Sequence, residues 1–145
     1  MNAVDLRAIL ADADHSGAYF IDERDGDAMA QTGAALGYEV MRVDLADCTG
    51  KDDVLHRIAQ AGGFPGWFGG NWDALSDALR DLSWRRAPGY LWLIVNAATW
   101  RAAHAEDFDV LLDVLNEAAF EWAGDGVAFW ALLTFPGDQL TSLED

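Results

Sequence analysis

The sequence predicts an α/β fold in which a mainly parallel sheet of three or four strands is covered by helices. Short apolar runs of strand length alternate along the chain with segments of helical periodicity. Parallel strands need long crossover connections, so this alternation is typical of a parallel sheet. The 145 residues, 52% of them hydrophobic, suit one domain with a single core.

The first third of the chain predicts a strand, a helix and a second strand. After a short polar start, residues 18–21 (AYFI) form a buried strand, and residues 22–26 supply a turn. The Ala-rich residues 27–36 are predicted to be helical, with Gly37 as the C-terminal stop. Residues 38–45 (YEVMRVDL) then form the second strand, giving a βαβ unit expected to be parallel and right-handed.

The middle of the chain predicts two helices separated by an unusual loop. Apolar residues at helical spacing indicate a helix over residues 51–61, which ends at the glycine pair 62–63. Residues 64–72 (FPGWFGGNW) are dense in both glycine and aromatic residues. They lead directly into a strongly patterned helix over residues 73–82.

The remaining residues predict a strand, a helix, a strand and a tail. The run at 90–95 (YLWLIV) is apolar throughout, as in a central strand covered on both faces. A long helix follows over residues 107–123, and a last strand over residues 127–133 (VAFWALL). Residues 135–145 form a polar tail. We interpret residues 1–145 as one domain.

The charge balance argues against direct binding of nucleic acid. The chain has 25 acidic against 9 basic residues and a formal net charge of −16, whereas nucleic-acid binding depends on Lys and Arg contacts to phosphates. An acidic field attracts basic proteins and speeds their encounter, although acidity also simply keeps a protein soluble. Cys48 is the single cysteine, and the sequence has neither a signal-peptide run nor a membrane-spanning stretch. The expected location is the cytoplasm.

The helix after the glycine-rich loop separates apolar from acidic residues. Its apolar stripe consists of Trp72, Leu75, Leu79 and Leu82, and its opposite side carries Asp73, Asp77 and Asp81. Asn71 suits the N-cap, and an acid in the first turn gains from the helix dipole. The later two aspartates repel each other weakly and would attract a partner that carries Arg or Lys. The alternative is an ordinary solvated helix face.

Residues 64–79 (FPGWFGGNWDALSDAL) resemble the signature of the barstar family of ribonuclease inhibitors. The specific part is Asn-x-Asp-Ala-Leu-x-Asp after a loop of aromatic residues and glycine. The order of predicted elements extends the resemblance over residues 38–133, so residues 1–37 would be an added strand and helix. Ser76 stands where the best-known member has an aromatic residue, and Gly70 where it has an acid, which leaves the identity of the target open.

The resemblance implies that the loop and the acidic helix block a ribonuclease active site, with carboxylates in place of the substrate's phosphates. Asp77 would be the central acid, and Glu117, on the last helix, would contribute a further carboxylate. Exposed glycines beside aromatic anchors and acids are also typical of binding hot spots. The candidate partner-binding residues are Trp67, Phe68, Gly69, Asn71, Asp73, Asp77, Asp81 and Glu117.

The sequence gives little support for catalysis or for a cofactor. Asp73 and Asp77 lie one turn apart on an open helix face, and nothing encloses them as a glycosidase pair. The histidines are scattered, no metal-binding motif is present, and the glycine pairs match no nucleotide-binding fingerprint. We therefore predict that the chain is not an enzyme and inhibits a basic, barnase-like ribonuclease. We expect it to be a bacterial antitoxin or immunity protein that needs no cofactor or metal. The rival hypotheses are a binding module for another cationic protein, and an acidic face that is only solvating.

Overall fold

The computed structural model describes residues 3–66 and 68–140. Its sheet has four strands, β1 (Ala18–Asp22), β2 (Glu39–Asp44), β3 (Gly89–Val95) and β4 (Ala128–Phe135). The strand order is β1-β4-β3-β2, and every neighbouring pair is parallel. The predicted α/β class and the parallel sheet are therefore confirmed, with four strands.

The two central strands form the middle of the core. Every residue of β3 and β4 is buried, as the unbroken apolar runs predict for strands covered on both faces. The two strands of the expected βαβ unit, β1 and β2, do not pair with each other and lie at opposite edges of the sheet. Although β1 precedes β4 by more than a hundred residues, Ala18 is in register with Ala131.

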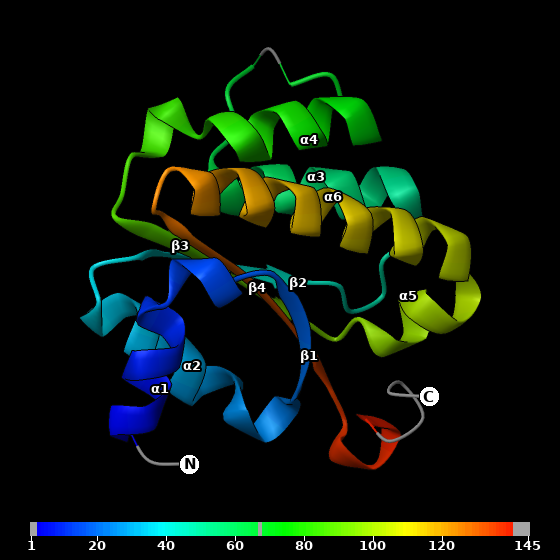
Figure 1. Cartoon of the computed structure of the whole chain (residues 1–145). Coiled ribbons are helices and arrows are strands. Elements are labelled where there is room, and N and C mark those ends of the chain that lie inside the picture. The colour runs from blue at the N-terminus through cyan, green and yellow to red at the C-terminus, as the bar shows by residue number, and fades with distance from the viewer. Residues whose placement is uncertain (1–2, 67, 141–145) are drawn as a thin grey trace.

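Helices cover both faces of the sheet (Figure 1). The helices α1 (Ala3–Ala11) and α2 (Gly26–Ala35) lie on one face, and α3 (Lys51–Gly62), α4 (Trp72–Asp81), α5 (Ala98–Ala103) and α6 (Ala105–Gly124) lie on the other. At the top of Figure 1, α4 lies above α3 and α6 and is the helix farthest from the sheet. Its outer side therefore faces away from the rest of the molecule.

The sequence pattern indicates only a polar start at residues 3–11 and does not predict the first helix. Two leucines one turn apart, Leu6 and Leu10, are buried and anchor α1. The carbonyl oxygen of Leu10 accepts hydrogen bonds from Trp130 Nε1 at 2.9 Å and from Tyr38 Oη at 2.8 Å. The N-terminal addition is thus a strand and two helices, and it is joined to the rest of the domain by these bonds.

The ends of the elements follow the local chemistry, with one correction. Gly37 and Gly63 adopt φ values of +82° and +62°, which glycine reaches without strain, and they follow α2 and α3 as predicted. Phe135, expected as the first residue of a polar tail, is instead the last residue of β4 and is 1% exposed. Its ring packs edge-on against Phe20 and Phe108, so it belongs to the core.

Candidate functional site

The helix α4 has the two faces that its sequence predicts. Leu75 and Leu79 are 0% exposed, and the partly buried Trp72 packs against the same core. All three aspartates of the acidic stripe, Asp73, Asp77 and Asp81, are exposed. Because burial of the leucines fixes the rotation of the helix, the carboxylates are held outward in a row.

The N-terminus of α4 is capped by Asn71. Its Oδ1 accepts a hydrogen bond from the backbone N–H of Ala74 at 2.7 Å, and its own backbone is extended. This satisfies one of the free N–H groups of the first turn and sets the angle at which the loop enters the helix. Asn71 is therefore a positioning residue in this structure.

The loop before α4 is attached to the core by aromatic rings. Phe68 is partly buried, and its ring meets that of Phe64 edge-on at 5.0 Å between centroids. Phe64 in turn packs edge-on against Trp84 and Trp92. Phe68 thus anchors the loop inward. The exposed Gly69 and Gly70 follow it, and Trp67 lies outside the described residues.

Two polar contacts hold α4 against α6. Trp122 Nε1 donates to the carbonyl oxygen of Leu79 at 2.8 Å, which joins the two helices at their buried side. At the surface, Arg80 Nη1 donates to Glu121 Oε1 at 3.2 Å, while Arg80 Nη2 donates to Asp77 Oδ1 at 2.7 Å. Glu121 and then Asp77 raise the pKa of Arg80 above its usual value. Arg80 therefore joins the acids of α4 to those of α6.

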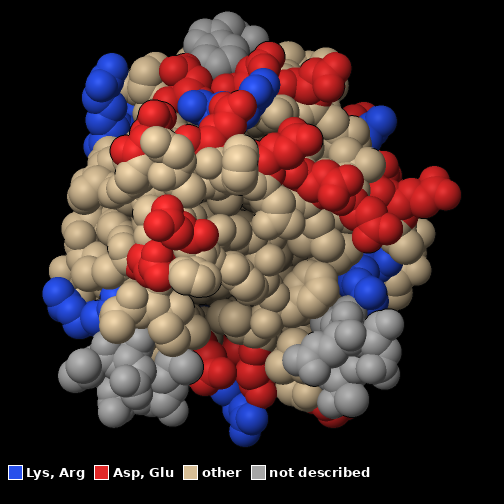
Figure 2. Space-filling view, in the orientation of Figure 1, with Lys and Arg blue, Asp and Glu red and all other residues tan. Residues whose placement is uncertain are grey.

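Glu117 lies on the α6 side of the same surface. It is exposed and lines a depression of about 550 Å³ together with Arg80, Asp113, Asn116, Phe120 and Glu121. Figure 2 shows acidic side chains gathered over α4 and along α6. The structure thus brings Glu117 to the surface on which Asp77 lies. We call this surface, made of Asp73, Asp77 and Asp81 of α4 and Asp113, Glu117 and Glu121 of α6, the acidic face.

The position of Phe120 was not singled out from the sequence, although the signal was present. Leu111, Leu115 and Ala118 define the buried side of α6, and helical periodicity places residue 120 on the opposite side. A phenylalanine that stands among acidic residues on the outer side of an amphipathic helix indicates an exposed aromatic side chain, and this pattern could have identified Phe120.

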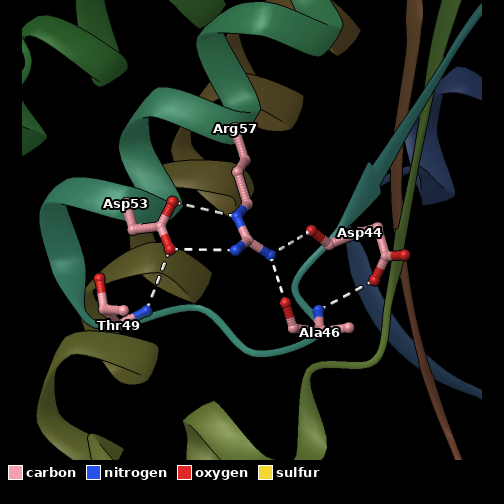
Figure 3. A network of polar contacts seen from close by, with 5 residues as sticks. All are labelled: Asp44, Ala46, Thr49, Asp53 and Arg57. Atoms are coloured by element: carbon pink, nitrogen blue, oxygen red, sulfur yellow. Dashed lines mark hydrogen bonds and ion pairs between the residues drawn. The ribbon is translucent and has the colours of Figure 1, made fainter.

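A second polar cluster has a structural role (Figure 3). The guanidinium of Arg57 on α3 donates twice to the Asp53 carboxylate at 3.0 Å and also to the carbonyl oxygens of Asp44 and Ala46. Asp53 accepts the backbone N–H of Thr49, and this bond, followed by Arg57, lowers the pKa of its carboxyl. The cluster fixes the turn between β2 and α3.

A comparison with models of protein families identifies the family of this chain. Residues 38–134, about two thirds of the chain, match the model of Barstar (barnase inhibitor). The chain belongs to the Barstar family. The matched residues run from the start of β2 almost to the end of β4 and include the loop, α4 and α6. No curated protein matches the chain.

Membership of the Barstar family indicates the general role of the chain. Members of this family are inhibitors of barnase-type ribonucleases and are not enzymes, so a protein partner is the general expectation. The unmatched residues before position 38 include α1, β1 and α2, which complete the sheet and cover its second face. Among the described residues, no helix combines the length and apolar character that crossing a membrane requires.

Proposed function

We propose that this chain inhibits a basic ribonuclease by covering its active-site groove with the acidic face and the preceding loop. The observation that carries the proposal is the placement of Asp73, Asp77 and Glu117 on one exposed surface of a Barstar-family protein. An active site that binds RNA must be rich in cationic groups, because it neutralises phosphates. A row of fixed carboxylates is complementary to such a groove.

In the proposed complex, Asp77 enters the site that normally holds a phosphate, and Asp73 lies beside it. Asp77 stands in the middle of the stripe, and its side chain is 70% exposed, so a partner can reach it without unfolding α4. Glu117 and Asp81 extend the negative surface on either side. The exposed Gly69 lets the backbone of the enzyme approach the loop closely, and Phe68 holds the loop in place.

Trp67 completes the proposed set of partner-binding residues as an aromatic contact beside the carboxylates. Inhibition of this kind is competitive and requires no cofactor. The net charge of −16 steers a cationic enzyme toward the chain, so association is fast and slows as salt is added. We place this encounter in the cytoplasm of a bacterial cell, where the chain acts as an antitoxin or immunity protein.

The test is a titration of ribonuclease activity with wild-type chain and two charge-matched variants. Asp77→Ala removes the central acid, and Asp138→Ala removes an acid from the red segment at the bottom of Figure 1, far from α4. Both variants lose one negative charge, so a difference between them reports a local contact. We expect Asp77→Ala to weaken inhibition by about a hundredfold or more and Asp138→Ala to leave it near the wild-type value.

The enzyme is barnase first and, in parallel, any protein that the wild-type chain captures from its source cell, assayed for ribonuclease activity after release. If the captured protein is cationic but cleaves no RNA, and barnase is not inhibited, the chain is a binding module for another cationic protein. If Asp77→Ala and Asp138→Ala inhibit the enzyme equally well, the acidic stripe is only a solvated helix face.

A further inference from the structure

One aromatic side chain is exposed where the packing of the domain gives it no role. Of the large hydrophobic side chains that the structure describes as exposed, Ile9, Tyr19 and Val110 lie between 37% and 45%, whereas Phe120 is 81% exposed. Its position on α6 is opposite the side that packs on the sheet. A phenylalanine there stabilises neither the core nor the helix, since alanine, glutamate and lysine all have higher helix propensity.

The surroundings of Phe120 are negatively charged. Three acids and one base line the same depression, namely Asp113, Glu117, Glu121 and Arg80. The base is already engaged, because Arg80 donates to both Glu121 and Asp77. An aromatic ring in this setting is complementary to a cation, since the ring face attracts positive charge and the carboxylates strengthen the attraction.

The depression lies on the α6 side of the acidic face and adjoins its α4 side through Arg80. Arg80 of α4 lines the depression, and its guanidinium pairs both with Asp77 on its own helix and with Glu121 on α6. A protein that binds at Asp77 therefore also covers the neighbouring Glu117 and Phe120. Aromatic residues are enriched in protein interfaces, and buried aromatic anchors often contribute a large share of the binding energy.

We propose that Phe120 is an aromatic anchor of the inhibitory surface, which receives an arginine or lysine side chain of the basic ribonuclease in the depression between Glu117 and Glu121. The cation lies against the ring and pairs with the flanking carboxylates. This inference rests on the proposed function and deepens it by adding a residue of α6 that determines which cationic enzymes fit. The occupant is the same enzyme that covers Asp77.

The test uses four single variants of the full chain against a ribonuclease that the wild type inhibits, either barnase or the enzyme captured from the source cell. Phe120→Ala removes the ring, Phe120→Leu keeps a large apolar group without a ring face, and Phe120→Tyr keeps the ring. Ile9→Ala on α1, beyond the sheet, is the matched control for loss of an exposed apolar side chain. Dissociation constants and thermal midpoints are measured for each.

We expect Phe120→Ala and Phe120→Leu to bind about tenfold more weakly, and Phe120→Tyr and Ile9→Ala to bind as the wild type does. The thermal midpoint of Phe120→Ala should equal or exceed that of the wild type, which separates a binding role from a structural one. If Phe120→Ala binds the ribonuclease with full affinity while Asp77→Ala binds it weakly, the inference is overturned and the proposed function stands. Full affinity of Phe120→Leu would refute the cation contact. A wild-type chain that inhibits no ribonuclease overturns both.

Discussion

Arg80 donates a hydrogen bond to Asp77 one turn earlier on α4, with 2.7 Å between Nη2 and Oδ1. The acid that we place at the centre of the inhibitory surface is therefore already paired within its own helix. The pair is well exposed, so solvent screens it and it contributes little to stability. It matters more for binding, because a cation of the enzyme must share or replace Arg80 at Asp77.

The first prediction concerns the removal of Arg80. Arg80→Ala frees the carboxylates of Asp77 and Glu121 and makes the acidic face more negative. We expect the association rate constant with a basic ribonuclease to rise about threefold at low salt, with the gain disappearing as salt is raised. Stopped-flow fluorescence at several ionic strengths measures this. Arg80→Lys keeps the charge and should associate at the wild-type rate; a rise for both variants would refute the electrostatic explanation.

A second prediction concerns the anchoring of α4. Leu79 is 0% exposed, and its carbonyl oxygen accepts the bond from Trp122. Leu79→Ala leaves a cavity under the acidic stripe and should lower the free energy of unfolding by about 2–5 kcal/mol. Urea denaturation followed by tryptophan fluorescence gives the value. Asp81→Ala, an exposed change on the same helix, should unfold close to the wild type; comparable losses in the two variants would mean that α4 is not held by its apolar stripe.

The features that could be predicted from the sequence are those that local patterns determine. Helical spacing placed Leu75 and Leu79 inward and Asp77 outward, and the sequence preference for an N-cap placed Asn71, whose side chain makes the expected bond to Ala74. The two central strands were recognisable because unbroken apolar runs are typical of strands covered on both faces. The prediction of a buried strand at residues 18–21 was wrong in its burial, because β1 lies at an edge of the sheet and none of its residues is buried. Boundaries shifted by one or two residues at most elements.

The remaining features depend on contacts between distant parts of the chain. The order of strands was not predictable, since only the folded sheet decides that β1 pairs with β4 and not with β2. Among the side chains of α1 whose burial is described, Leu6 and Leu10 are the buried ones, and Tyr38 and Trp130 donate hydrogen bonds to the carbonyl oxygen of Leu10. The short helix α5 has one buried anchor, Trp100. Such weak local patterns become stable only through tertiary packing.

A third prediction concerns pH. The side-chain amide of Asn96 and the backbone N–H of Ala46 both donate to Asp44 Oδ1, at 2.7 and 2.9 Å. Asn96 first and then Ala46 lower the pKa of Asp44 below the usual carboxyl value of 3.8, because these donors favour the ionised form. The stabilisation is therefore fully present above pH 3.8 and is lost as the pH falls through the lower pKa of the folded state.

The measurement compares the wild type with Asp44→Asn, which keeps the shape and cannot ionise. The difference in free energy of unfolding between the two should be largest near neutral pH and should shrink as the pH falls below 3.8. Because both proteins share the same remaining charges, the difference cancels the general effect of acid. A difference that stays constant with pH would show that the ionised carboxylate of Asp44 adds nothing to stability.

The last prediction separates the N-terminal addition from the proposed inhibitory surface. Leu10 is 1% exposed and anchors α1 on the face of the sheet opposite to α4. Leu10→Ala should lower the free energy of unfolding by about 2–4 kcal/mol and leave the affinity for the ribonuclease unchanged, since the sheet lies between the cavity and the acidic face. Chemical denaturation measures the free energy of unfolding, and inhibition titrations under conditions in which the variant is folded measure the affinity. If Leu10→Ala remains folded but loses much of its affinity, α1 also affects the binding of the partner. The cavity itself could not cause this loss by direct contact, because the sheet separates it from the acidic face.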